Sequence, residues 1–380
     1  MTEPTTQTTD AAAPADLLYS EAEDDLRAAV RSLLADRCDA PTVLTRAESD
    51  TPYDPQLWAS LTTDMGLAGL LVPEKLGGQG ATHREAAVVL EELGRSVAPA
   101  PYLTSGVVAA ETLLACDTQD GAVAELLVPL ANGRAVVVLA APLAASADTA
   151  LSGAVRADAD GALSGRVTGV ADAAAATVLL VPAQDGLYAV AAGAAGVTVE
   201  SLTPLDLTRP LAIVTFDGAA GKRLADSAAE PVRRGLLAGA GLLASEQLGL
   251  AEWCLEEVVR YTRDRKQFNR PVGSFQALKH RMAQLWLEVV SARAAARNAA
   301  DALATGSADV QVAVAVAQVY CSRVAVHAAE ECVQLHGGIG MTWEHPAHLY
   351  LKRAKSDSIA LGAPGRHKET LAELMDLRAP

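Results

Sequence analysis

The hydrophobic pattern of this chain changes period twice along its length, and this change constrains the fold more than any other feature. From Leu17 to about Asn132, apolar residues recur at helical spacing. From about Arg134 to Phe216, Gly, Asp and Pro break the apolar runs about every ten residues, as is typical of antiparallel sheets. After Gly221 the long helical patterns return. The sequence therefore predicts an α+β fold with a helical N-terminal part, a middle sheet and a C-terminal helical part.

The middle part contains short apolar runs that we interpret as strands. The clearest are Val136–Leu139, Val178–Val181, Leu187–Val190 and Leu211–Phe216.

The C-terminal part begins with a helical pattern over Leu236–Arg260, in which Glu256 and Arg260 are expected to form an i,i+4 ion pair. Glycine is costly inside a helix, so its recurrence here predicts that another element packs very close; the residues are Gly239, Gly241 and Gly249. The run Asp309–Gln334 contains no breaker and is expected to be one long helix. Three or four such helices would form a bundle.

Composition limits the partners and the compartment. The 380 residues are 50% hydrophobic, enough for a large core and two or three domains. A formal charge of −15 argues against nucleic acid or an anionic membrane as partner. The five cysteines form no CxxC pair and are expected to be buried free thiols in a reducing compartment; they are Cys38, Cys116, Cys254, Cys321 and Cys332.

The N-terminal segment MTEPTTQTTDAAAPAD has neither a basic region nor an apolar run. It is not expected to be a signal peptide, and residues 1–16 are interpreted as a disordered tail. Because no membrane helix is expected either, a cytoplasmic protein is predicted.

Two motifs in the C-terminal part suggest a phosphate-bearing ligand. YTRDRKQFNRPVGSFQ concentrates cations in an acidic chain, and Arg265 offers a planar, permanently charged fork. Gln334 begins QLHGGIG, in which a helical pattern stops at a glycine cluster that permits close backbone approach. On the residues alone, an ordinary interhelical loop explains these features equally well, because bare glycine loops are weak signals.

The longer segments YTRDRKQFNRPVGSFQALKH and ECVQLHGGIGMTWEHPAHLYLKRAK resemble the C-terminal domain of acyl-CoA dehydrogenases. VPEKLGGQGATHREAAVVLEELGR and the sheet-rich middle also resemble this family, so the resemblance spans about Leu17 to Leu377. It implies a helical N-terminal domain at 17–133, a middle β-domain at 134–221, and a four-helix bundle at 222–380 that drives tetramerisation.

The resemblance also implies the cofactor. In the family, FAD lies across a subunit interface, and one subunit holds the ADP half of a flavin whose ring sits in its neighbour. The matching residues here are Arg265, Gln267, Phe268, Phe275, Gln276, Gln334, Gly337 and Gly338. The family reaction removes a proton from the α-carbon of an acyl-CoA and passes a hydride from the β-carbon to the flavin. An electron-transfer flavoprotein is the implied electron acceptor.

The same resemblance exposes a missing residue, because the reaction needs a carboxylate base. The family places this glutamate at one of two positions, which are occupied here by Leu361 and Gly239. The family arginine near the CoA end of the substrate is replaced by Ala240. The middle-domain stretch Ala140–Asp148 also lacks the family's Thr, Glu and Gly. No catalytic residue is therefore predicted in this chain.

Three other carboxylates are candidates to replace the missing base. Glu246 follows Gly239 by about two helical turns, and Glu344 and Asp357 are further candidates, but a structural role is the preferred interpretation of each. His345 and His348 lie three residues apart beside Glu344 without a further ligand in a nearby motif, so no metal site is predicted.

These observations lead to the hypothesis of a non-catalytic subunit in an α2β2 acyl-CoA dehydrogenase, inactive alone. A homologous catalytic subunit would supply the base and most of the acyl-CoA pocket, with bulky thioesters such as steroid side chains as the substrate class. One alternative is a self-sufficient homotetrameric enzyme with an unrecognised base such as Glu246. Another is a scaffold that binds no flavin.

Overall fold

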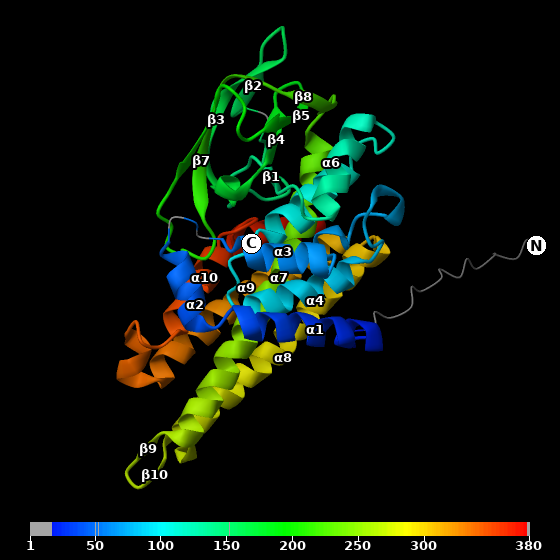
Figure 1. The fold of residues 1–380 in the computed structure, drawn as a ribbon. Coiled ribbons are helices and arrows are strands. Elements are labelled where there is room, and N and C mark those ends of the chain that lie inside the picture. The colour runs from blue at the N-terminus through cyan, green and yellow to red at the C-terminus, as the bar shows by residue number, and fades with distance from the viewer. Residues whose placement is uncertain (1–16, 50, 52, 152, 378–380) are drawn as a thin grey trace, which may run out of the picture.

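The computed structural model describes residues 17–377 except 50, 52 and 152. The predicted tail at 1–16 lies outside the described residues. The helical, sheet and helical parts follow one another as predicted, with the sheets above the helices in the view of Figure 1. The N-terminal part consists of α1 (Glu21–Arg37), α2 (Ala40–Ala47), α3 (Pro55–Ala59), α4 (His83–Arg95), α5 (Ala110–Leu114) and α6 (Gly121–Ala131), linked partly by short 3-10 and π turns.

The middle part contains two four-stranded sheets. The first has the order β1-β4-β5-β8, with bounds Val137–Leu139, Val178–Ala183, Gly186–Ala191 and Lys222–Ala225. The second has the order β2-β3-β7-β6, with bounds Val155–Ala157, Ala162–Ala171, Leu211–Ala220 and Val197–Ser201. The strand pairs are antiparallel except β1 with β4, which are parallel.

The predicted apolar runs form β1, β4, β5 and β7, and the alternation along β7 buries Ala212, Val214 and Phe216. The middle part extends past residue 221. Gly221 connects β7 of the second sheet to β8, which pairs with β5 in the first sheet before the next helix begins.

The C-terminal part contains three long helices that pack against one another: α7 (Ala229–Asp264), α8 (Gln276–Thr305) and α9 (Val310–Leu335). The short strands β9 (Lys266–Gln267) and β10 (Arg270–Pro271) form a hairpin between α7 and α8. This hairpin lies at the far tip of the helices, away from the sheets (Figure 1). After α9 follow η7 (Gly337–Met341), α10 (Ala347–Asp357) and α11 (Pro364–Leu374), and both α10 and α11 pack on α9.

The single long helix predicted between residues 309 and 334 is confirmed as α9. Within the described residues it is the one helix long and apolar enough to cross a membrane, and 61% of its most apolar window is buried. Such burial against α7 and α8 is what the core helix of a helical domain shows.

The glycines of α7 sit where other elements approach closely, as predicted. A Cβ at Gly249 would collide with the backbone carbonyl of Glu91 on α4, and one at Gly241 would lie 2.6 Å from Leu303 Cδ1 on α8. Helix α7 is thus fixed on several sides, which makes it a rigid support for the functional residues along its length.

The predicted ion pair between Glu256 and Arg260 is wrong. Glu256 binds Arg95 on α4, with 2.6 Å between Oε2 and the guanidinium, while Arg260 binds Glu257 one turn before it. The reason is tertiary: α4 packs against α7 and brings a competing guanidinium to Glu256.

Candidate functional site

The two positions at which the family places its base meet in space. Gly239 is buried in α7, and Leu361 follows α10. A Cβ at Gly239 would lie 2.6 Å from Val108 Cγ2 and 3.1 Å from Leu361 Cδ1, so aliphatic groups fill the space beside the glycine. We call Gly239, Ala240, Leu361 and the cavities beside them the closed region.

Leu361 is held firmly in this place. Its backbone N–H donates to the carbonyl of Leu143 at 2.7 Å, and its own carbonyl lies 3.1 Å from His367 Nε2. Its φ of 53° is in the left-handed region, which a leucine adopts only when its surroundings impose it. The side chain is 4% exposed.

An apolar cavity of about 30 Å³ remains beside Leu361. Such a volume admits a water molecule or two, whereas pockets for cofactors and drug-sized ligands measure about 300–1,000 Å³. Its lining, all within the described residues, includes no carboxylate; it consists of Leu103, Thr104, Val108, Val138, Leu139, Ala141, Pro142, Leu143, Ala171, Leu236 and Leu361. The one hydroxyl in this lining, that of Thr104, donates to Asp172 at 2.6 Å.

The residue that the resemblance places at the family's CoA-binding arginine is Ala240. Ala240 borders a second cavity of about 30 Å³. Asp148 on its rim is tied to α11, because Arg366 lies 3.5 Å from its carboxylate and the Thr370 hydroxyl donates to it at 3.3 Å.

Glu246 has a different setting from that of a free base. It is 2% exposed, and its carboxylate accepts hydrogen bonds from Arg209 and Arg353, both at 2.5 Å. Burial raises the pKa of Glu246, but the two guanidinium groups outweigh this effect and hold the pKa below its usual range. A carboxylate held between two arginines is stabilised as an anion and is a weak proton acceptor.

The other candidate carboxylates also lie away from the cavity lining. Asp357 is fully buried 3.3 Å from Arg209, and burial raises its pKa well above the usual range. Glu344 is exposed.

The predicted ADP-binding residues form a second, contrasting area, which we call the exposed region. It comprises the β9–β10 hairpin with its flanks and the glycine loop η7. All of these residues are exposed except Phe275, which is half-buried: Arg265, Gln267, Phe268, Phe275, Gln276, Gln334, Gly337 and Gly338.

The hairpin presents its side chains outward. Phe268 is 86% exposed and, with Asn269, adopts the left-handed backbone that a two-residue hairpin turn requires. The ring of Phe275 lies edge-on to Phe268 with centroids 6.1 Å apart, and the Arg270 guanidinium stacks on its face at 3.9 Å. Among the described residues, Arg265 has no ion-pair partner, which leaves its guanidinium available to an external anion.

The glycine loop is joined to the end of α7. The Tyr261 hydroxyl donates to the carbonyl of His336 at 3.3 Å, and the two rings lie with centroids 4.3 Å apart. Gly337 has a φ of 62°, and Cβ atoms at Gly337 or Gly338 would meet nothing within 4 Å. The backbone of this loop therefore faces open space, where a ligand can approach it closely.

This donor set fits the diphosphate and adenosine end of a dinucleotide. Arg265 supplies a charged fork, Gln267 and Gln334 supply amides, and the glycine loop permits close approach to its backbone. The closed region offers no comparable fit for a flavin ring and an acyl chain.

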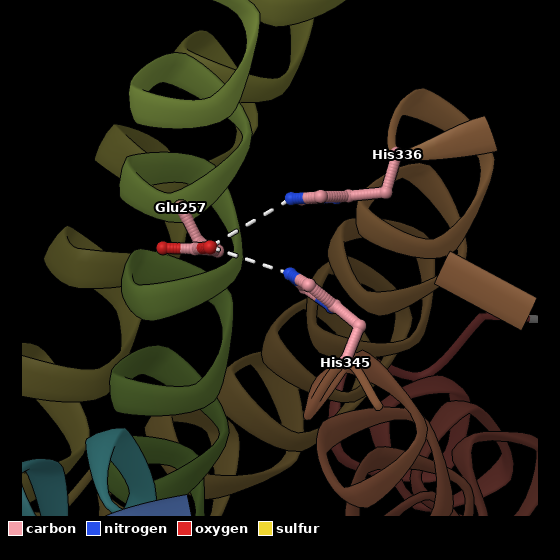
Figure 2. A group of neighbouring side chains, drawn as sticks. All are labelled: Glu257, His336 and His345. Atoms are coloured by element: carbon pink, nitrogen blue, oxygen red, sulfur yellow. Dashed lines mark hydrogen bonds and ion pairs between the residues drawn. The ribbon is translucent and has the colours of Figure 1, made fainter. Parts of the chain in front are cut away.

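The structure also unites three titratable residues that the sequence interpretation did not connect. Glu257 on α7 faces both His336 and His345, as Figure 2 shows. The sequence had instead paired His345 with His348, whose ring packs against Trp343 with centroids 4.6 Å apart. The sequence did contain a signal that Glu257 lies near the predicted ADP-binding residues, because it stands one helical turn before Tyr261 and two turns before Arg265.

Comparisons with known proteins agree with this architecture. Residues 231–375 match the model of the acyl-CoA dehydrogenase C-terminal domain, and residues 20–134 match that of the N-terminal domain. The acyl-CoA dehydrogenase IpdE2 of Mycolicibacterium smegmatis is 36% identical over 350 residues, covering 91% of this chain and 96% of the relative.

Two solved structures are similar over nearly their whole length. The ChsE4–ChsE5 complex from Mycobacterium tuberculosis contains a chain with a TM-score of 0.84 and 27% identity, covering 96% of this chain and 100% of that one. A variant of the Tcur3481–Tcur3483 steroid ACAD gives a TM-score of 0.83 and 28% identity, covering 94% and 98%.

The fold and the sequence matches together define a flavoprotein oxidoreductase that acts on acyl-CoA. The chain belongs to the acyl-CoA dehydrogenase family.

Proposed function

We propose that this chain is the non-catalytic subunit of a heteromeric acyl-CoA dehydrogenase. Its exposed region would hold the ADP half of FAD, and a homologous partner in an α2β2 assembly would surround the flavin ring and supply the base and the CoA pocket. The observation that carries this proposal is the closed region, where the two positions matched to the family's base carry no carboxylate and the cavity beside Leu361 is too small for an acyl chain.

The separation of the two regions supports the division of labour. Gly239 and Arg265 are 26 residues apart along α7 and its end, which corresponds to about 39 Å at the helical rise. A single flavin cannot reach across that distance. The flavin held by the exposed region therefore belongs with a catalytic pocket on another chain.

The surface of α8 offers an apolar face for such a partner. Trp286 is 56% exposed, Leu287 is 53% exposed, and Val290, which follows them by four and three residues and so lies beside both on the helix surface, is 37% exposed. Association through this face would bring the hairpin arm of one subunit toward its neighbour.

The chemistry assigned to this chain is binding and orientation. When bound, FAD accepts the hydride that leaves the β-carbon of the acyl-CoA. Arg265 would neutralise phosphate charge, the glutamine amides would orient polar groups, and the backbone of the glycine loop would accommodate close approach.

The substrate class follows from the similar proteins. One similar structure is described as a steroid ACAD, and another is a complex of two chains. We therefore assign a bulky, steroid-derived acyl-CoA, with an electron-transfer flavoprotein as electron acceptor and the cytoplasm as location.

The test is to produce the full chain alone and together with the acyl-CoA dehydrogenase encoded beside its gene. We expect flavin and dehydrogenase activity only in the co-produced complex. A yellow, active preparation of the chain alone would overturn the proposal in favour of a self-sufficient enzyme. A colourless complex would show that the chain is a scaffold.

A further inference from the structure

Glu257 occupies a place between the two motifs of the exposed region. Its Oε1 lies 3.3 Å from His345 Nε2 and 3.7 Å from His336 Nε2 (Figure 2). His336 belongs to the QLHGG motif, and Glu257 precedes Arg265 by about two turns of α7. The side chains are largely buried, with exposures of 13% for Glu257, 10% for His345 and 0% for His336. We call these three residues the Glu257 cluster.

The hydrogen bonds around the cluster fix its protons. His336 Nδ1 lies 2.6 Å from the carbonyl of Cys332, so this nitrogen carries a proton and donates it. His345 Nδ1 accepts the backbone N–H of Ala347 at 3.2 Å, so the proton of its neutral ring is on Nε2, facing Glu257. His336 Nε2 is buried with no hydrogen-bond partner, and the Glu257 carboxylate is the anion beside it.

These contacts favour an ion pair over a bound metal. The ligand atoms lie within 4.8 Å of one another, which is compatible with metal spacing. A metal on His345 Nε2, however, would require the proton on Nδ1, where the Ala347 N–H would then lose its acceptor. A protonated His336 beside the Glu257 carboxylate pairs the two charged groups and leaves the Ala347 N–H bound to His345 Nδ1.

The charge state of His336 agrees with this assignment. Burial lowers its pKa, but the contacts with Cys332 and the Glu257 carboxylate outweigh burial and raise the pKa to about 9. The contact with His336 in turn lowers the pKa of Glu257.

Further titratable groups face the cluster from the packed helices. Cys332 Sγ on α9 is 3.8 Å from His336 Nδ1, and the hydrogen bond with Cys254 on α7 lowers the pKa of Cys332 to about 6. On α7, Arg260 binds Glu257 and the Tyr261 ring packs on His336.

We propose that Glu257 is a positioning residue for the ADP-half site: by binding His336 and His345 it holds the glycine loop at a fixed place relative to the arginine-bearing end of α7. This inference rests on the function proposed above. His336 is enclosed by Tyr261 through ring contact at 4.3 Å and by His345 at 4.0 Å, and Glu257 completes the enclosure at the ring edge. Gly337 and Gly338 come directly after His336 in the chain, so fixing His336 also fixes the position of their backbone.

The experiment compares four variants of the full chain in the co-produced complex: Glu257→Gln, Glu257→Asp, the control Glu256→Gln and the reference Arg265→Ala. Glu256 lies on the same turn, but its partner Arg95 belongs to α4. At pH 7.5 we expect Glu257→Gln to weaken FAD binding roughly 3–10-fold, with partial rescue by Asp and no change in the control. In the wild type, FAD binding should weaken as the pH rises through about 9, and in Glu257→Gln this decline should begin at lower pH.

A second measurement needs no partner. Histidine hydrogen–deuterium exchange in the full chain alone should give a His336 pKa near 9, lower by about one unit or more in Glu257→Gln. If Glu257→Gln changes neither FAD affinity nor this pKa while Arg265→Ala weakens FAD binding, the positioning role is overturned and the ADP site stands. If Arg265→Ala also has no effect, the proposed function itself fails. Stoichiometric binding of Zn²⁺ that depends on Glu257 would show a metal site and would also overturn the inference.

Discussion

The closed and exposed regions are supported by the same helix but differ in nearly every physical respect. Around Gly239 the side chains are aliphatic, buried and in close contact, and the cavities hold a few water molecules at most. Around Arg265 the side chains are polar or aromatic and exposed. The cavities of the closed region leave no room for a substrate, whereas the exposed side chains of the hairpin are accessible to a partner or ligand. The proposed division between a non-catalytic chain and a catalytic partner depends on this contrast.

The largest expected effect comes from restoring a carboxylate to the closed region by Leu361→Glu. An ionised carboxylate in the apolar cavity lacks a partner, so the free energy of unfolding should fall by roughly 3–4 kcal/mol at pH 7. Because burial raises the folded-state pKa of this glutamate, the loss should be smallest below about pH 4 and grow as the pH rises. Urea denaturation of the full chain measures both effects.

The matched control for this substitution is Leu361→Met, which preserves volume and should cost less than about 1.5 kcal/mol. A Leu361→Glu chain that is as stable as the wild type and binds acyl-CoA would show that the closed region is an open pocket. The contrast between the closed and exposed regions would then no longer hold.

In the exposed region, Arg265→Ala should weaken FAD binding in the co-produced complex about 10–100-fold, because a hydrogen bond between charged groups is lost. Arg265→Lys should bind at an intermediate level, since a lysine lacks the bidentate fork. Isothermal titration of the deflavinated complex gives the affinities. The control is Arg263→Ala, which removes an equal, exposed charge from the last turn of α7. Equal losses in both variants would indicate a general charge effect in place of a specific contact.

A double-mutant cycle sharpens the description of the closed region. Gly239→Ala adds a methyl group 2.6 Å from Val108 and 3.1 Å from Leu361, so it should destabilise the chain by about 1–3 kcal/mol through overpacking. Leu361→Ala removes one of the two obstructing groups. The cost of Gly239→Ala should therefore be smaller by about 0.5–1 kcal/mol in the Leu361→Ala background, measured by urea denaturation. Additive costs would mean that the two residues do not compete for one space.

The sequence predicted the features that depend on local pattern. The period of the apolar residues identified the long helices and the strands β1, β4, β5 and β7. It did not reveal β2, β3, β6 and β8, several of which are short or half-exposed and lack a continuous apolar run. The parallel pairing of β1 with β4 was also beyond reach, because strand direction is decided by topology.

The site shows the same limit more clearly. Motif matches led to the prediction that Leu361 and Gly239 occupy the positions of the family's base, and this stays a prediction. They did not reveal that Glu246 is held by two arginines, because these partners come from a loop before β7 and from α10, far away in sequence. Nor did they join Glu257 to His336 and His345, because i,i+4 reasoning along α7 assigned Arg260 to the wrong carboxylate. Pairings between helices depend on packing that no single segment encodes.

The smallest expected effect is a dependence of stability on pH that arises at the boundary of the exposed region. The folded-state pKa of His336 is raised from 6.5 to about 9, so the stabilisation by the charged pair is complete below about pH 6.5 and is lost as the pH rises through 9. The stability difference between wild type and Glu257→Gln in urea should therefore be larger at pH 6 than at pH 10. Glu256→Gln provides the contrast, because its partner Arg95 stays charged throughout and its effect should be the same at both pH values. A Glu257→Gln effect that does not change with pH would mean that the cluster is neutral, and the exposed region would then be held by packing alone.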